Sequence, residues 1–118
     1  MMPITYEIVN NCKIKCESEN AELDNIENTL VDESEKSKIR WKKFDYELII
    51  DALELFEERL DLAQYVTEFR GEDGFMYTSS PEINDIGNNL KSSHSGASFA
   101  LTLRKCQSII KNELQKID

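Results

Sequence analysis

The feature that most constrains the fold of this chain is a long series of apolar residues at helical spacing after position 45. Residues that recur every three or four positions share one face of a helix, so the series predicts an amphipathic helix at the centre of the core. Asp45 is a suitable N-cap, and Gly71 requires the helix to end by Arg70 at the latest. The apolar face consists of Tyr46, Ile49, Ile50, Leu53, Phe56, Leu60 and Ala63, widened by Leu48, Ala52, Leu55 and Leu62.

Residues 4–16 alternate between apolar and polar side chains, which is typical of half-buried strands. A turn at residues 9–11 would join two short strands into a β-hairpin with one apolar face, made of Ile4, Tyr6, Ile8, Cys12, Ile14 and Cys16. A helix is the alternative, because four of these residues, Ile4, Ile8, Cys12 and Cys16, are also spaced by four. We favour the hairpin.

The next two segments carry opposite charges. Residues 17–35 contain acids and no Lys or Arg, and Leu23, Ile26 and Leu30 predict a helix of about three turns within them. Residues 36–43 are basic and surround Ile39 and Trp41; they fit either a strand with one basic face or a helical extension. Residues 65–79 are similarly ambiguous, since a hairpin around 71–74 competes with the end of the central helix.

The C-terminal third predicts two helices. Ser80-Pro81-Glu82 is a typical helix start, and Ile83, Ile86 and Leu90 would form its buried side. After a loop at 92–96, Ser98 could cap a last helix with an apolar stripe of Phe99, Leu103, Cys106, Ile110, Leu114 and Ile117. We therefore expect a single domain over residues 1–118, mainly α: a compact helical bundle with a small N-terminal β-hairpin (α+β), or alternatively an all-α fold.

Composition excludes several classes of function. The 118 residues contain 23 Asp and Glu against 14 Lys and Arg, a formal net charge of -9. Such a chain is poorly suited to neutralising the phosphates of nucleic acid or to docking on anionic lipid, so neither direct nucleic-acid binding nor a membrane partner is expected. No run of 18 apolar residues occurs and the N-terminus lacks the features of a signal peptide, so we expect a cytoplasmic protein with free thiols.

No catalytic or metal-binding motif emerges from the sequence. Cys12 and Cys16 have one residue too many between them for the common zinc knuckle, and the single histidine, His94, is the only base for a nucleophile. The acids of residues 71–74 would repel a phosphate. We therefore predict no catalytic residue, no metal ligand, no cofactor and no enzyme. Trp41 among cations could stack on nucleic acid, but those cations could equally neutralise the acidic segment before them.

The acids of the central helix are segregated rather than mixed with cations. Glu47, Asp51, Glu54, Glu58 and Asp61 follow one another at steps of four, three, four and three, with Glu57 beside them. Like charges at this spacing cost a helix about 0.2–0.5 kcal/mol per pair, so the row slightly destabilises the helix. The row is either a solvated face or a docking surface for a basic protein. Residues 17–35 would enlarge its negative field. A loop bearing Glu72, Asp73, Phe75 and Tyr77 could add aromatic contacts.

The acidic helix over residues 45–61, together with the acidic-aromatic loop over 71–77, resembles bacterial immunity proteins of the contact-dependent growth-inhibition or colicin-nuclease type. The resemblance implies an inhibitor that binds and neutralises a basic toxin domain, most simply a nuclease. It assigns partner binding to Glu47, Asp51, Glu54, Glu58, Asp61, Glu72, Asp73, Phe75 and Tyr77. Two further hypotheses stay open: a nucleic-acid mimic or anti-defence protein, and a small enzyme or accessory subunit.

Overall fold

The fold is known from a computed structural model, which describes residues 3–70, 80–90 and 96–116. These residues form five α-helices and contain no strand. In chain order the helices are α1 (Tyr6–Thr29), α2 (Glu33–Glu58), α3 (Leu60–Glu68), α4 (Pro81–Asn89) and α5 (Gly96–Gln115). None of these helices is both long and apolar enough to cross a membrane.

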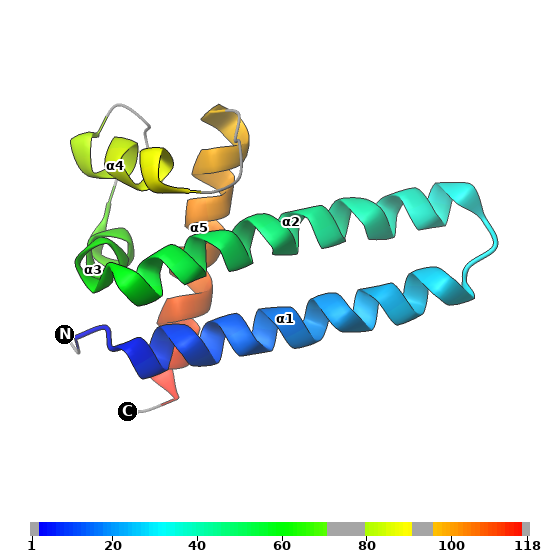
Figure 1. Cartoon of the computed structure of the whole chain (residues 1–118), viewed down its shortest axis with the longest axis horizontal. Coiled ribbons are helices and arrows are strands. Elements are labelled where there is room, and N and C mark those ends of the chain that lie inside the picture. The colour runs from blue at the N-terminus through cyan, green and yellow to red at the C-terminus, as the bar shows by residue number, and fades with distance from the viewer. Residues whose placement is uncertain (1–2, 71–79, 91–95, 117–118) are drawn as a thin grey trace.

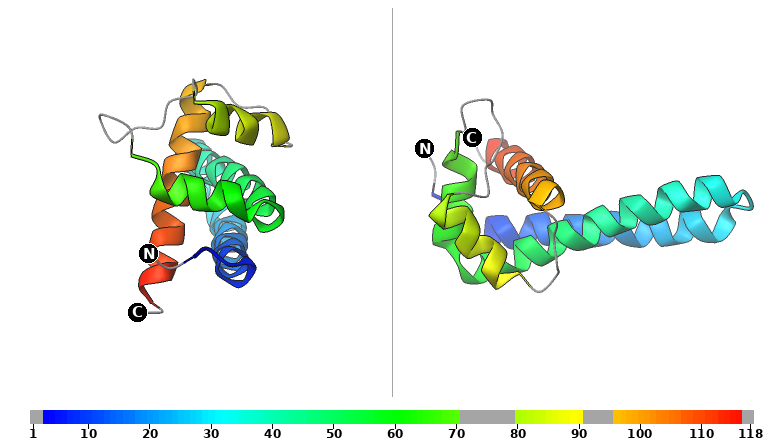
Figure 2. Two further views of the ribbon diagram at one scale, coloured as in Figure 1. Left: turned by 90° about the vertical axis from the view of Figure 1, so that its left-hand side faces the viewer. Right: turned by 90° about the horizontal axis from the view of Figure 1, so that it is seen from above.

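The two longest helices, α1 and α2, run antiparallel and are joined by a short turn (Figure 1). α5 crosses this pair, while α3 and α4 lie at the end away from the turn (Figure 2). The halves of α1 and α2 next to the turn extend beyond the other helices, and we call this part, residues 20–44, the arm. The molecule is accordingly elongated, with principal extents of 46 × 32 × 26 Å.

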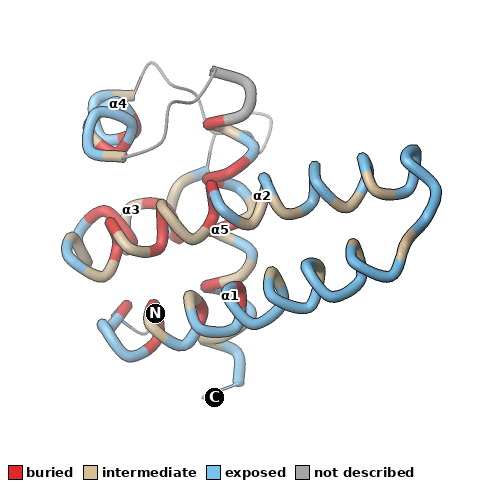
Figure 3. The backbone as a smooth tube through the Cα atoms, turned by 45° about the vertical axis from the view of Figure 1, so that its right-hand side comes forward, coloured by how far each residue is buried: buried red, intermediate tan, exposed pale blue. Residues whose placement is uncertain are grey.

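The core lies at the end of the molecule opposite the turn, where all five helices meet (Figure 3). Most of the predicted apolar face of the central helix is buried there, as the sequence pattern predicted, with Leu53 and Phe56 fully enclosed. Tyr46, Ile50 and Leu60 pack against it from partly buried positions. The other fully enclosed large side chains are Val9, Cys12, Cys16, Val66, Ile83, Ile86, Leu103, Cys106 and Ile110.

The predicted N-terminal hairpin is wrong, because residues 6–29 form α1. Thr5 caps this helix by accepting a hydrogen bond from the backbone N–H of Ile8 at 3.3 Å. The face that packs on the core is the one spaced by four: Ile4, Ile8, Cys12 and Cys16 are buried. Tyr6 and Ile14, which the hairpin would have turned inward, are both more than half exposed. The described part of the chain is therefore all-α.

The predicted start of the central helix at Asp45 is also wrong. α2 begins twelve residues earlier, at Glu33, where the side chain of Asp32 accepts from the N–H of Ser34 at 3.0 Å. Residues 36–43 are therefore helical. Asp45 lies within α2 and accepts a hydrogen bond from Lys105 of α5 at 3.0 Å instead. α2 and α3 are separated by Arg59, whose φ of -123° and ψ of 77° are not helical.

The C-terminal predictions are largely confirmed. Pro81 is the first residue of α4, and Ile83 and Ile86 are buried. α5 begins at Gly96, before the predicted cap Ser98, and buries Phe99, Leu103, Cys106 and Ile110. Residues 65–68 belong to α3, so the first strand of the alternative hairpin is wrong. Its second strand at 75–79, most of the loop at 92–96, and Ile117 lie outside the described residues.

Candidate functional site

Four of the predicted partner-binding residues share one face of α2. Glu47 and Glu58 are exposed, and Asp51 and Glu54 are half-buried. At 1.5 Å per residue these four carboxylates span about 16 Å of the helix. The remaining predicted residues do not extend this row: Asp61 lies beyond the break, on α3, and Glu72, Asp73, Phe75 and Tyr77 lie outside the described residues.

Asp61 is exposed and pairs with a neighbouring cation. Its two carboxylate oxygens accept from Nε and Nη2 of Arg59 at 3.1 and 3.0 Å, and Nη2 also lies 3.4 Å from Oδ2 of Asp85 on α4. The hydrogen bond from Arg59 lowers the pKa of Asp61. Arg59 thus links Asp61 of α3 to Asp85 of α4, and a role of Asp61 in partner binding stays a prediction.

The row borders a cleft of about 350 Å³, which lies among the first half of α1, the second half of α2 and the end of α4. Four carboxylates line it, those of Asp51, Glu54, Glu57 and Glu58. The other lining residues are Tyr6, Lys13, Leu55 and Asn89. A cleft with four acids and one cation among its lining residues carries a negative potential, because low-dielectric walls focus the field of the charges in excess.

Glu57 is the most enclosed of these acids. Its side chain is only 7% exposed, and Oε1 lies 2.6 Å from the ammonium of Lys13, whose side chain is 21% exposed. The hydrogen bond to Glu57 raises the pKa of Lys13. The second oxygen, Oε2, is buried and has no hydrogen-bond partner within the described part of the chain. From the sequence, Glu57 was only a neighbour of the acidic row. Its ion pair could not be predicted, because Lys13 reaches it only when residues 6–29 form a helix.

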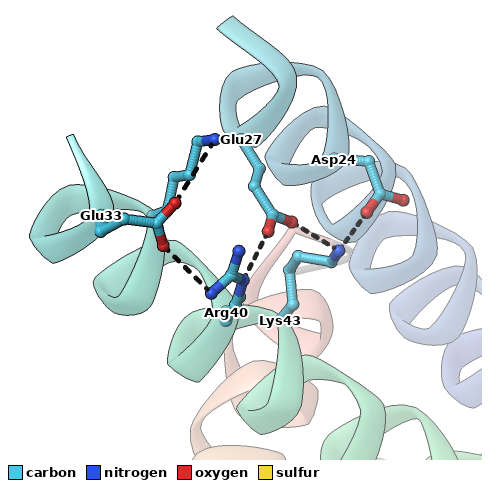
Figure 4. A network of polar contacts seen from close by, with 6 residues as sticks. Asp24, Glu27, Glu33, Arg40 and Lys43 are labelled. Carbon is cyan, nitrogen blue, oxygen red and sulfur yellow. Dashed lines mark hydrogen bonds and ion pairs between the residues drawn. The ribbon is translucent and has the colours of Figure 1, made fainter. Parts of the chain in front are cut away.

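Cations of the basic segment pair with three acids of the arm, Asp24, Glu27 and Glu33 (Figure 4). Glu27 accepts from Arg40 at 2.8 Å and from Lys43 at 3.0 Å. Lys43 also contacts Asp24, and Arg40 lies 3.8 Å from Glu33. The hydrogen bonds from Lys43 and Arg40 lower the pKa of Glu27. The basic segment thus neutralises part of the acidic segment before it, and an enlargement of the negative field by the remaining acids of residues 17–35 stays a prediction.

Trp41 lies on the exposed side of the same segment. It is 68% exposed and meets Phe44 edge-on, with ring centroids 6.1 Å apart. Two of the four nearby cations, Arg40 and Lys43, are already paired with acids of the arm. The remaining two give Trp41 little of the cationic surface that stacking on nucleic acid would require.

A cavity of about 650 Å³ lies among α1, α2 and α5 and carries both signs of charge. Two ion pairs form among its lining residues: Lys105 with Asp45 at 3.0 Å, and Lys116 with Glu113 at 3.4 Å. The hydroxyl of Tyr46 donates to Glu19 at 2.6 Å, which raises the pKa of Tyr46 to about 12. With four acids and four cations among its lining residues, the cavity has no excess of one charge that would select a ligand.

The three cysteines are free thiols in the core. Burial raises the pKa of Cys12 to about 12 and that of Cys16 to about 11, and it raises the pKa of Cys106 further. Among the residues with described positions, no group of three or more His, Cys, Asp or Glu side chains is arranged to hold a metal ion. His94 lies outside them. These thiols contribute to packing as small apolar groups.

No family model matches the chain, and comparison with curated proteins and with solved structures finds no match.

Proposed function

We propose that this protein is an inhibitor of the immunity type, which binds a basic toxin domain through the acidic face of α2. The observation that carries the proposal is the convergence of Asp51, Glu54, Glu57 and Glu58 on one cleft, beside Glu47. In the arm, by contrast, Arg40 and Lys43 pair with Asp24 and Glu27. The cleft differs from the arm in placing four lining carboxylates beside Lys13.

A nuclease is the partner class that this surface fits best. Enzymes that grip phosphates are basic, and a concentrated negative patch accelerates association with a basic protein and selects against other partners. The like-charged row costs α2 some stability, which burial of Leu53 and Phe56 on its opposite face offsets. We propose that the protein acts in the cytoplasm as a binding protein and not as an enzyme.

The size of the surface is adequate for such a complex. A standard interface buries about 800 Å² of each partner, a small part of the 7188 Å² that this chain exposes. Charge alone seldom supplies high affinity, which aromatic residues at the centre of an interface usually provide. Tyr6, which is 55% exposed and lines the cleft, is suitably placed for this role.

The test compares two triple charge reversals. The first variant carries Glu47→Lys, Asp51→Lys and Glu58→Lys on the acidic face. The second carries Glu22→Lys, Glu33→Lys and Glu35→Lys, which change the net charge equally at exposed positions on the arm. The probe is the protein encoded directly upstream of this chain, with association measured by stopped flow at about 50 and 300 mM salt. Circular dichroism checks that both variants fold.

We expect the first variant to associate at least about tenfold more slowly at low salt, and the second to change the rate far less. The difference should shrink at high salt, because ions screen the interaction. Equal rates for the two variants would contradict a docking role for this face. If the protein instead displaced DNA from many unrelated DNA-binding proteins, the nucleic-acid mimic would replace the inhibitor as the better hypothesis.

A further inference from the structure

The cleft beside α2 holds a carboxylate that is only half satisfied. The side chain of Glu57 is more than nine-tenths buried. Among the described residues, Lys13 contacts Oε1, and no donor reaches the buried Oε2. A buried carboxylate oxygen without a donor is destabilising, because it has lost its hydration and gained no hydrogen bond. The carboxylate of Glu57, at the edge of the cleft, can therefore accept a second hydrogen bond from a cation that takes the place of Lys13.

We propose that the cleft receives an arginine side chain of the partner, which takes the place of Lys13 and binds both oxygens of Glu57. This inference rests on the proposed function, since it supposes a basic protein partner. A guanidinium presents parallel N–H groups that match the two oxygens of a carboxylate, whereas an ammonium is a point charge. One arginine can therefore satisfy Oε1 and Oε2 together, which Lys13 does not.

Lys13 is suited to act as a displaceable occupant. Its side chain is partly exposed, and a long aliphatic stem allows a lysine to carry its charge out to solvent. The unliganded protein thus avoids leaving Glu57 without any cation, which would be costly for a buried charge. When an arginine enters, the ammonium of Lys13 regains water while Glu57 exchanges one hydrogen bond for two.

Tyr6 favours arginine over lysine in the cleft, and two acids attract either cation. The ring of Tyr6 lines it and is more than half exposed, so a planar guanidinium can stack on it. Asp51 and Glu58 add negative charge to the walls. The volume, about 350 Å³, is within the range of small-ligand pockets in proteins.

The test uses hexa-arginine and hexa-lysine peptides, titrated calorimetrically into the full chain at about 20 mM salt. We expect hexa-arginine to bind about tenfold more tightly than hexa-lysine, and Glu57→Gln to remove most of that preference. Glu47→Gln removes the same charge from α2 outside the cleft and should weaken both peptides by only about twofold. Equal affinities for the two peptides, or equal losses in the two variants, would overturn the proposal.

A second variant covers the case in which Glu57→Gln is poorly folded. Lys13→Met removes the internal occupant, so it should tighten hexa-arginine binding and let the peptide raise the melting temperature more than in the parent protein. Unchanged or weaker binding by Lys13→Met would argue against displacement. The two proposals can fail separately. Equal binding of both peptides would contradict the arginine site but would leave the acidic docking face of the proposed function standing. Unaltered association of the charge-reversed variant would contradict the docking face itself.

Discussion

The ammonium of Lys13 on α1 lies 2.6 Å from Oε1 of Glu57 on α2, and this contact joins the two helices where they enter the core. We expect Lys13→Met to lower the free energy of unfolding by about 1–3 kcal/mol, because it leaves a buried carboxylate without its cation. The double variant Lys13→Met/Glu57→Leu should recover most of this loss, since an apolar pair needs no partner. Urea denaturation measures all three proteins.

Lys15→Met is the matched control for that series, because Lys15 is exposed two positions further along α1. Equal destabilisation by both substitutions would show that the Lys13–Glu57 contact contributes nothing specific.

The pH dependence of the Lys13–Glu57 contribution has a defined sign. Since the pKa of Lys13 is raised in the folded state, the contribution of the pair is complete at neutral pH and is lost as pH rises above the ordinary lysine pKa of about 10.4.

Glu27 provides a direct measure of the contacts within the arm. The hydrogen bonds from Lys43 and Arg40 lower its pKa, so Lys43→Met should raise that pKa toward the ordinary glutamate value. Carbon-detected NMR of the Glu27 carboxyl over pH 2–7 gives the value. The exposed Lys38, on the same helix, supplies the control Lys38→Met, which should leave the Glu27 pKa almost unaltered.

The sign of the effect on stability follows from the same contacts. Because the folded pKa of Glu27 is lowered, its contribution is present above the ordinary pKa of about 4.3 and is lost as pH falls through the lowered value. Acid should therefore loosen the arm, seen as a fall in the amide protection factors of residues 20–44, which correct for the slower intrinsic exchange at low pH. Equal exchange rates in the parent protein and in Lys43→Met at pH 6 would contradict a stabilising role for these ion pairs.

The cysteines should be unreactive in the folded protein. Thiol reagents attack the thiolate, and burial raises the pKa of Cys16 from an ordinary value of 9.0 to about 11, which lowers the thiolate fraction about a hundredfold at pH 8. Burial also denies access to the reagent. We expect almost no reaction of native protein with Ellman's reagent and three reactive thiols per chain in urea. Rapid labelling of Cys12 or Cys16 without denaturant would show that the core opens there.

Gly87 marks the contact between α4 and α5. A Cβ atom at this position would lie 3.2 Å from Cζ of Phe99, a buried ring of α5. A β-branched residue cannot fit without shifting that ring, so Gly87→Val should destabilise the protein by about 1–3 kcal/mol despite replacing a helical glycine. Asn88→Val places the same side chain at an exposed neighbouring position and should change stability by less than about 0.5 kcal/mol. Thermal unfolding distinguishes the two.

The sequence predicted the core better than the ends of the helices. The apolar stripes over 46–63 and 99–110 are long and strongly periodic, and nearly all of their members are buried or pack against the core. The apolar residues of 4–16 fit both the two-residue period of a strand and the four-residue spacing of a helix. The choice between strand and helix depended on whether Tyr6 and Ile14 face inward. They are exposed because the other helices pack on the face of α1 that carries Ile8, Cys12 and Cys16. That information is tertiary and is absent from a local pattern.

Helix boundaries were harder to predict for a related reason. Asp45 has the chemistry of an N-cap, but its carboxylate finds a partner in Lys105, sixty residues away, so the helix continues through it. The arm contains few apolar residues and is held by ion pairs between α1 and α2, which a single-segment pattern cannot reveal. The acidic row was predictable from spacing alone. The cleft was not, because it needs Lys13 and Tyr6 from a helix that was predicted as strands.

The position of α5 at the end of the chain has a consequence for folding during translation. Cys12 emerges from the ribosome early, but part of its surroundings comes from α5, where the carbonyl of Ile109 lies 3.9 Å from its sulfur. α1 and α2 can pair soon after residue 58 is made, since their contacts are close in sequence. A nascent chain that halts before residue 96 would therefore carry a formed helical pair with an open apolar side, which is the kind of surface that chaperones bind.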